Sequence, residues 1–279
     1  MAQLSIPYTL VGPDGTRVVW GNSDAAKADP DYIGWLNPDD GITGLDSAQV
    51  REVAEDGVAE DGGTHGNFLF GRRTVTFAGM INPNGSMATI NALEEKVRQA
   101  SFAMRADATL TWTPDGSPAR RLLLRRQVER VGTGRRPKGW FLSLVSAAWQ
   151  IDGAVEKSVS RAVAGPTVMM ATNAGTAASF PRFELTGPLN NATVSIRNHH
   201  LPGSPIIYKT KPVVLNAGQV LAVDFKTGKV TVGGAPRGGL TDFMASPWTP
   251  LRAGTNNLEV LTSVASDLAW TVFFRDAWV

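Results

Sequence analysis

The chain has 279 residues, of which 43% are hydrophobic and 19% are charged, and this length predicts about two domains, each with its own core. The formal net charge of +2 is small, so the composition as a whole does not indicate nucleic acid or an anionic membrane as the main partner. There is no cysteine, which excludes disulfides, thiolate zinc sites, iron–sulfur clusters and cysteine nucleophiles.

The first residues, MAQLSIPYTL, lack the positive and long apolar regions of a secretory signal. The longest apolar stretch, GWFLSLVSAAW, is too short to cross a bilayer. We therefore expect a soluble protein without a membrane partner, which stays inside the cell that makes it until it is released.

The first half of the chain reads mainly as strands, and turn residues such as those of GPDG and PDG separate them. We predict strands at YTLVG, TRVVWGN, RTVTFAGMI, ATLTWTP, ARRLLLRRQVERVG and KGWFLSLVSAAWQI. One helix is predicted from Ser86 to about residue 104, because apolar residues recur there at three- and four-residue spacing. Glu94 and Arg98 can form an ion pair on its polar face.

The second half continues with strands, predicted at FPRFELTG, ATVSIRN, PIIYKT, QVLAVDF, KVTVGG, NNLEVLTS and AWTVFFRDAWV. Before them lies a stretch rich in small residues and without a clear period, which predicts a domain boundary. We expect an N-terminal β domain with one helix over 1–155, a linker over 156–176, and an antiparallel sandwich over 177–279.

Residues for catalysis or for metal and cofactor binding are not apparent. His65, His199 and His200 have no carboxylate or histidine at helical metal-ligand spacing, and we interpret the adjacent pair as an exposed loop. The glycines of GTHG are not followed by a phosphate-binding helix, and no nucleophile, zinc-protease or kinase motif is present. We expect no enzyme, no cofactor and no metal.

Basic residues concentrate between Arg120 and Lys138, where Glu129 is the one acid. This run could contact phosphates, but it lacks the interleaved aromatics of single-strand binders. The other interpretation is a subunit-facing sheet surface that meets acidic segments such as AEDGVAED. The candidate subunit-interface or channel residues are Arg72, Arg73, Arg120, Arg121, Arg125, Arg126, Arg130, Arg135 and Arg136.

The order of motifs along most of the chain resembles the distal tail protein (Dit) family of siphovirus-type bacteriophages. In the first half, a glycine-rich acidic segment precedes GNFLFGRRTVTFAGMI, and SMATINALEEKVRQA and TLTWTPDGSPARRLLLRR follow. In the second half, the order is TNAGTAASFPRFELTGPLNNATVSIRN, AGQVLAVDFKTGKVTVGG, SPWTPLRAGTNNLEV and a last strand that ends with FRDAW.

This resemblance implies a homo-hexameric ring between the tail tube and the tail-tip hub of the virion, assembled in the host cytoplasm. The N-terminal β-sandwich with its helix would build the ring around a channel for DNA. The C-terminal, galectin-like sandwich would offer a platform for tip or receptor-binding proteins. The implied partners are the tail tube protein, the hub (tail-associated) protein and the tape measure protein.

Within that family, Arg72 and Arg73 would begin a ring-domain strand, and the acidic loop before them would fold against a neighbouring subunit or the tail tube. Two alternatives remain open. A carbohydrate-binding adhesion module is suggested by the sandwich and by Trp248, Trp270 and Trp278, although core or rim packing suits these side chains better. A nucleic-acid-binding protein is suggested by the basic run.

Overall fold

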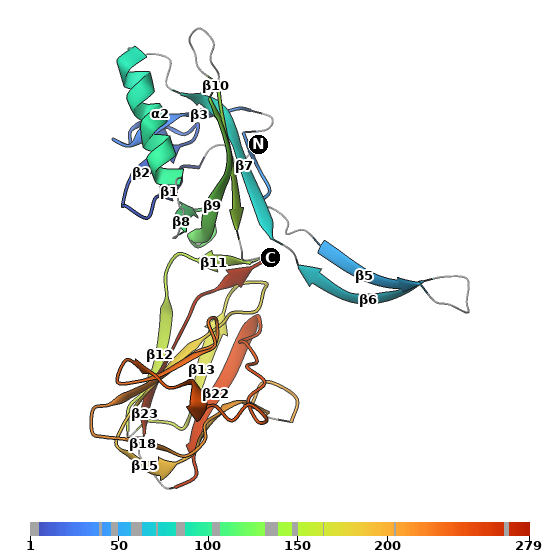
Figure 1. Cartoon of the computed structure of the whole chain (residues 1–279), viewed down its shortest axis with the longest axis vertical. Helices are drawn as coiled ribbons and strands as arrows, with labels where there is room; N and C mark the ends of the chain where they lie inside the picture. Colours follow the sequence, from blue (N-terminus) through green and yellow to red (C-terminus); the bar gives the residue numbers. More distant parts are fainter. Residues whose placement is uncertain are drawn as a thin grey trace. The chain divides into compact units, whose positions relative to one another are not determined.

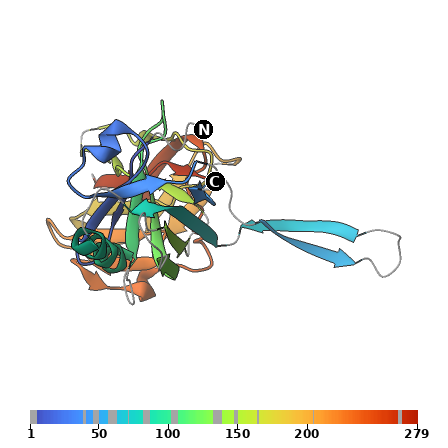
Figure 2. The ribbon, with the colours of Figure 1, turned by 90° about the horizontal axis from the view of Figure 1, so that it is seen from above.

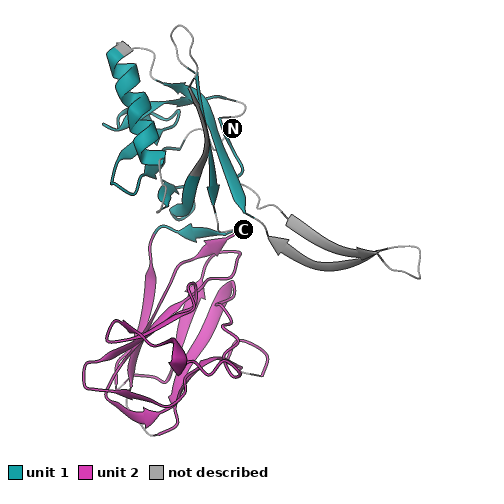
Figure 3. Ribbon diagram, in the orientation of Figure 1, with its two compact units in different colours: residues 1–154, 279 teal, residues 155–278 magenta. Residues whose placement is uncertain are grey.

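The computed structural model describes residues 6–38, 41–45, 50–56, 63–70, 72–81, 87–101, 107–131, 139–146, 150–163, 165–203, 205–264 and 268–279. The chain divides into two compact units, residues 1–154 with 279 and residues 155–278 (Figure 3). Both are built mainly from β-strands, which confirms the predicted class. In the described part of the chain, no helix has the length and apolar character needed to cross a membrane.

The first unit contains all six strands predicted for it, together with further elements that the sequence did not reveal (Figure 1). Its elements are β1 (Tyr8–Val11), β2 (Arg17–Trp20), α1 (Asp24–Lys27), β3 (Tyr32–Leu36), β4 (Ile42–Thr43), β5 (Val50–Asp56), β6 (Gly63–Phe70), β7 (Arg73–Ile81), α2 (Met87–Ser101), β8 (Ala108–Trp112), β9 (Arg120–Val131), β10 (Gly139–Ser146) and β11 (Ile151–Gly153).

The main sheet of this unit closes on itself. Its strands follow the order β10-β7-β3-β2-β1-β8-β9, and β9 pairs again with β10. All neighbours are antiparallel except β2 and β3, which run parallel. The unit is therefore one closed barrel, whereas the prediction was a sandwich of two facing sheets. The pattern of apolar residues predicts where strands lie, but it does not specify which strands pair to close the sheet.

Side chains fill the barrel. Trp20 packs edge-on against Phe77, with ring centroids 4.8 Å apart, and against Trp140 at 5.7 Å. Tyr8 also lies within 6.2 Å of Phe77. Apolar residues alternate into this core along β7, as predicted, and each large aromatic contributes extensive buried area. The barrel is thus a packed core, as expected for a small number of strands.

Helix α2 covers one side of the barrel and contacts β1, β2, β7 and β9 (Figures 1 and 2). Its buried apolar residues are Ile90, Val97 and Ala100, which share one face. The predicted helix is confirmed over 87–101, and its predicted first residue, Ser86, lies outside the described residues. At the turn after β1, a Cβ on Gly12 would stand 2.9 Å from the Cα of Ala100, so this close approach requires glycine.

Strands β5 and β6 form a two-stranded antiparallel sheet of their own (Figure 1). The register runs from Val50 opposite Phe70 to Asp56 opposite Gly63. The acidic, glycine-rich segment expected as a loop therefore contributes the end of one strand and most of the next. Its side chains lie outside the described residues.

The second unit contains β12 (Lys157–Arg161), β13 (Val168–Asn173), β14 (Arg182–Thr186), β15 (Leu189–Ala192), β16 (Val194–Asn198), β17 (Ile206–Lys209), β18 (Val213–Leu215), β19 (Val220–Asp224), β20 (Lys229–Val232), β21 (Ala235–Pro236), the 3-10 helix η2 (Gly238–Leu240), β22 (Gly254–Thr262), β23 (Ala269–Phe274) and β24 (Ala277–Trp278). One sheet has the order β12-β23-β14-β19-β20-β21, and the other has the order β13-β22-β16-β17.

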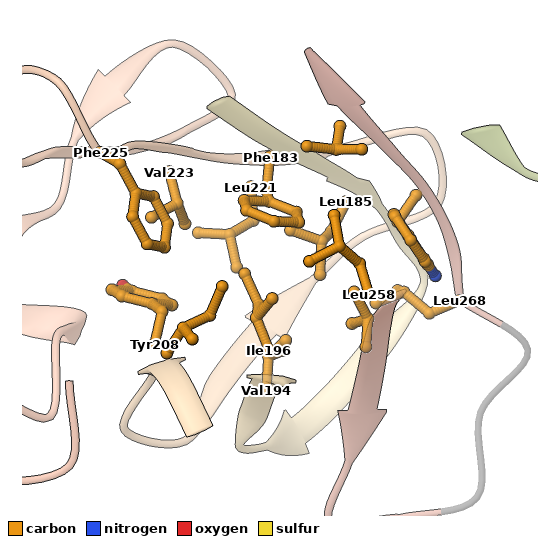
Figure 4. Close-up of a cluster of buried hydrophobic side chains, with 14 of the residues drawn as sticks. Phe183, Leu185, Val194, Ile196, Tyr208, Leu221, Val223, Phe225, Leu258 and Leu268 are labelled. Atoms are coloured by element: carbon orange, nitrogen blue, oxygen red, sulfur yellow. The ribbon is translucent and has the colours of Figure 1, made fainter. Parts of the chain in front are cut away.

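The side chains between these two sheets form one core (Figure 4). Phe183 and Leu221 point from the first sheet toward Ile196 and Leu258 of the second. The antiparallel sandwich is thus present. The stretch 156–176, expected as a linker, instead supplies strands β12 and β13, because main-chain pairing with β23 and β22 orders it despite its weak apolar pattern.

Candidate assembly surface and its arginines

The start of β7 places its two arginines in opposite environments. Arg72 is exposed, whereas only 1% of Arg73 is exposed. The guanidinium of Arg73 donates from Nη1 to the carbonyl oxygen of Leu45 at 2.6 Å and to that of Gly44 at 3.3 Å. Arg73 therefore holds residues 44–45, which precede β5, against the start of β7, which follows β6. The chain segments on both sides of the β5–β6 hairpin are thus connected by one side chain.

Arg73 was a candidate interface or channel residue, and the structure corrects that expectation. Because side chains alternate along a strand, Arg73 points to the same side as Val75 and Phe77, toward the barrel core. It is then buried against backbone carbonyls of its own chain. Arg72 remains available as a contact residue.

The arginines of β9 divide along the strand. Arg120 and Arg121 are half-buried, opposite Trp112 and Thr111 of β8. Burial lowers the pKa of the Arg120 guanidinium, which stays charged at neutral pH. Arg125 is exposed and donates from Nε to Asp107 Oδ1 at 2.5 Å. The acidic partner of Arg125 is thus a residue of its own chain, whereas the interface interpretation expected one on a neighbouring subunit.

The other candidates are less completely described. The backbone of Arg126 lies opposite Leu144 and that of Arg130 opposite Phe141, within the pair that closes the barrel. The side chains of these two residues, and all of Arg135 and Arg136, lie outside the described residues. In the described part of the basic run, the backbone of Arg125, Arg126 and Arg130 thus belongs to the β9–β10 pair.

An ion cluster that the sequence did not reveal joins α2 to the barrel. Arg17 on β2 forms a two-point contact with Asp29 at 2.7 Å and reaches Asp31 at 2.8 Å. Lys96 on α2 donates to Asp31 at 2.5 Å. The hydrogen bonds from Arg17 hold the pKa of Asp29 below its usual value, and those from Lys96 and then Arg17 do the same for Asp31.

Two residues of the stretch TNAGTAASFP, Asn173 and Gly175, have structural roles in the second unit. The side chain of Asn173 accepts from the backbone N–H groups of Gly175 and Ala277, both at 3.1 Å, and donates to Ala177 O at 2.7 Å. A Cβ on Gly175 would stand 1.8 Å from the carbonyl oxygen of Ala277. These two residues therefore hold the end of β13 and the turn after it against the start of β24.

The buried carboxylate of Asp276 completes this fastening. It accepts from the backbone N–H of Ala174 at 2.7 Å and forms an ion pair with Lys157 of β12. A buried carboxylate is stable when it is paired and hydrogen-bonded in this way. The FRDAW stretch thus holds the last strand to the start of its own unit.

The histidines and tryptophans do not assemble a chemical site in the described residues. His199 and His200 lie in the turn after β16, and His199 Nε2 is 2.8 Å from Glu259 Oε2. The side chain of His65 lies outside the described residues, and no group of three possible metal ligands occurs among those that are described. Trp270 and Trp278 are buried, and Trp248 packs on Tyr208 and Phe225.

The chain is similar to known phage tail proteins. Residues 174–278 match the model of the family described as siphovirus-type tail component, C-terminal domain. These residues belong to that family. The matched range begins directly after β13 and ends with β24, so it covers the second unit except for its first two strands, β12 and β13. The family is a structural tail component and not an enzyme family, in agreement with the sequence prediction.

Solved structures extend the likeness to both units. The Dit protein (gp 19.1) of phage SPP1, described as a paradigm of the hub adsorption apparatus in phages that infect Gram-positive bacteria, superposes with a TM-score of 0.68 at 13% identity and covers 98% of this chain and 99% of its own. A chain of the phage P2 baseplate in its activated conformation with Ca gives 0.50 at 9% identity, covering 96% and 97%. The whole chain therefore has the Dit fold. Comparison with curated proteins gave no match.

Proposed function

We propose that the chain is a distal tail protein whose six copies form a ring between the tail tube and the tail-tip hub of a siphovirus-type phage. The observation that carries this proposal is the shared fold along 98% of the chain with a protein described as part of a hub. The tail-component domain at 174–278 supports it independently. The chain then acts in the virion, at the tail tip, after assembly in the host cytoplasm.

The filled barrel supports a particular place for the DNA channel. Trp20, Phe77 and Trp140 pack together inside the barrel, so a duplex cannot pass through one subunit. The channel is instead the central opening of the ring, and each barrel forms part of its wall. Arg121 and Arg125 on β9 are candidates for the channel or the subunit contact.

The β5–β6 hairpin is the element proposed to join neighbours. Its two strands pair with each other, and an isolated hairpin is only marginally stable in water. Contact with the next copy would stabilise it. In a ring every contact is head-to-tail, so the acidic sequence AEDGVAED at 54–61 can meet a basic surface that includes Arg72 on the next subunit.

The sandwich at 155–278 serves as the platform for proteins of the tail tip. The partners on this account are the tail tube protein, the hub protein, the tape measure protein and receptor-binding proteins, with transient passage of DNA.

Gold labelling of phage particles tests this location. A short epitope tag is added after Val279, which is exposed, and purified particles are labelled with an antibody. We expect label at the distal end of the tail. Label along the tail tube, at the capsid, or on none of the particles would contradict the proposal.

A further inference from the structure

The segment after helix η2 exposes two large apolar side chains side by side. Met244 is 99% exposed and Phe243 is 70% exposed, at the tip of the turn from Asp242 to Ala245. Single exposed apolar residues are common on protein surfaces, but an aromatic and a methionine together on one protruding turn are characteristic of contact sites. We call Phe243 and Met244 the apolar tip.

The apolar tip stands on a rigid base. The segment that bears it runs along β17, where Asp242 N donates to Lys209 O at 3.0 Å and Trp248 N donates to Ile207 O at 3.1 Å. Ser246 Oγ both accepts from Lys209 N and donates to Lys209 O, each at 2.9 Å. The tip is thus held by main-chain contacts to the sheet.

The residues on either side of the tip are buried. Thr241 and Ser246 are almost completely inaccessible, and the hydroxyl of Tyr208 lies 3.3 Å from Thr241 Oγ1. The ring of Trp248 anchors the far end by packing on Tyr208, with centroids 4.9 Å apart. Since the base is already ordered, little conformational entropy is lost when Phe243 enters a pocket, while the flexible Met244 can adapt to its shape.

The charges around the tip are mainly basic. Lys211 and Arg237 are exposed, and Lys209 is half-exposed. Lys211 N donates to Leu240 O and Leu240 N donates to Arg237 O, so both residues adjoin the segment that leads to the tip. The one acid within it is Asp242. A partner with complementary charge has carboxylates around an apolar pocket.

We infer that the apolar tip docks into an apolar, acid-rimmed pocket on a different protein of the phage tail. This inference rests on the proposed function, because it takes its partner from the virion. It adds the site of contact and the chemistry of the partner surface.

Site-specific photo-crosslinking in particles tests the inference. The phage is propagated with benzoylphenylalanine in place of Phe243, and a matched phage carries it in place of Val214, which is 56% exposed on β18 of the same unit. After irradiation, we expect position 243 to yield a covalent product with another tail protein and position 214 to yield none. The crosslinked peptide should contain both apolar and acidic residues.

Other outcomes overturn the inference. A product at 243 only with a second copy of this chain or with lipid, an equal yield at 214, or no product would each do so. If the particles contain the chain, the proposed function survives that failure; if the chain is absent from particles, both fall. As a second test, replacing both Phe243 and Met244 by serine should lower the yield of infectious particles at least tenfold, with the fold intact by circular dichroism. Unchanged yield would contradict the inference.

Discussion

Arg73 is the residue whose role differs most from its expected one. Replacing it with methionine keeps much of its apolar stem but leaves the carbonyl groups of Leu45 and Gly44 without their donor. Such a loss costs about 1–3 kcal/mol in the free energy of unfolding. Denaturant unfolding of Arg73→Met should show this loss, and the exposed Arg72→Met should stay within about 0.5 kcal/mol of the parent chain. Equal effects of both substitutions would contradict this role of Arg73.

Charge reversal separates folding from assembly at the same two positions. Arg72→Glu should reduce ring formation while the monomer remains folded, because Arg72 is exposed. Arg73→Glu should instead prevent the barrel from folding, since it sets a carboxylate against carbonyl oxygens. Light scattering and circular dichroism distinguish the two effects. A soluble Arg72→Glu protein with the ring yield of the parent chain would count against the contact role.

Gly175 is a second position where a single added carbon atom should destabilise the fold. Gly175→Ala brings a Cβ to 1.8 Å from the carbonyl oxygen of Ala277, so the segment after β13 must move away from the last strand. We expect the second unit to lose at least about 3 kcal/mol, at the upper end of overpacking effects. Gly239→Ala is a matched control, because its Cβ would meet nothing within 4 Å. Thermal unfolding of both variants checks this, and a harmless Gly175→Ala would contradict the fastening.

At the scale of elements, the ion cluster predicts how the docking of α2 depends on pH. The pKa values of Asp29 and Asp31 are lowered in the folded chain, so their contribution is complete above the unfolded value of about 4 and is lost as the pH falls through the folded values. Lys96→Met should cost about 0.5–1 kcal/mol at pH 7, because the groups are partly exposed.

This cost should shrink toward pH 2, because the carboxylate that Lys96 contacts gains a proton as the pH falls through its lowered pKa. Lys27→Met, which removes the exposed partner of Asp24, is the control and should have little effect at either pH. Thermal unfolding at the two pH values measures both. A Lys96→Met cost that is equal at pH 7 and pH 2 would show that the ion pair is not its source.

The hairpin β5–β6 gives a prediction for assembly. Replacing residues 50–70 with a short glycine–serine linker should abolish the ring and leave a folded monomer, because the hairpin lies outside the closed barrel sheet. The same linker in place of the exposed turn 226–228 should leave the ring intact. Light scattering compares the two. Rings formed without the hairpin would show that other surfaces join the subunits.

The sequence predicted local structure better than it predicted pairing. Alternation along 73–81 and the apolar face of 87–101 were sufficient for β7 and α2. The same alternation puts Arg73 on the buried side of the strand with Val75 and Phe77, but its charge led us to predict an exposed contact residue. Strand β12 was missed because every second residue is exposed and the others are half-buried, which gives a weak pattern. The closed barrel needs β10 to pair with β7 as well as with β9, and the Arg17 cluster brings Lys96 to Asp31. The β7–β10 pair and the Lys96–Asp31 contact join distant residues, which no local pattern encodes.

At the scale of the whole molecule, the proposed function gives each of the two units a separate role. In the proposal, the packed barrel and its hairpin would build the ring, and the sandwich would present the apolar tip to other tail proteins. If DNA passes through the proposed ring, the small net charge of the chain favours weak contact rather than tight binding.

The central claim is the ring, and the molar mass in solution tests it most directly. Light scattering of the purified chain, with negative-stain images of the same fraction, should give six times 29.8 kDa, about 179 kDa, and rings with a central hole. A mass of 29.8 kDa, both for the chain alone and in the presence of the tail tube and hub proteins of the same phage, would contradict the account.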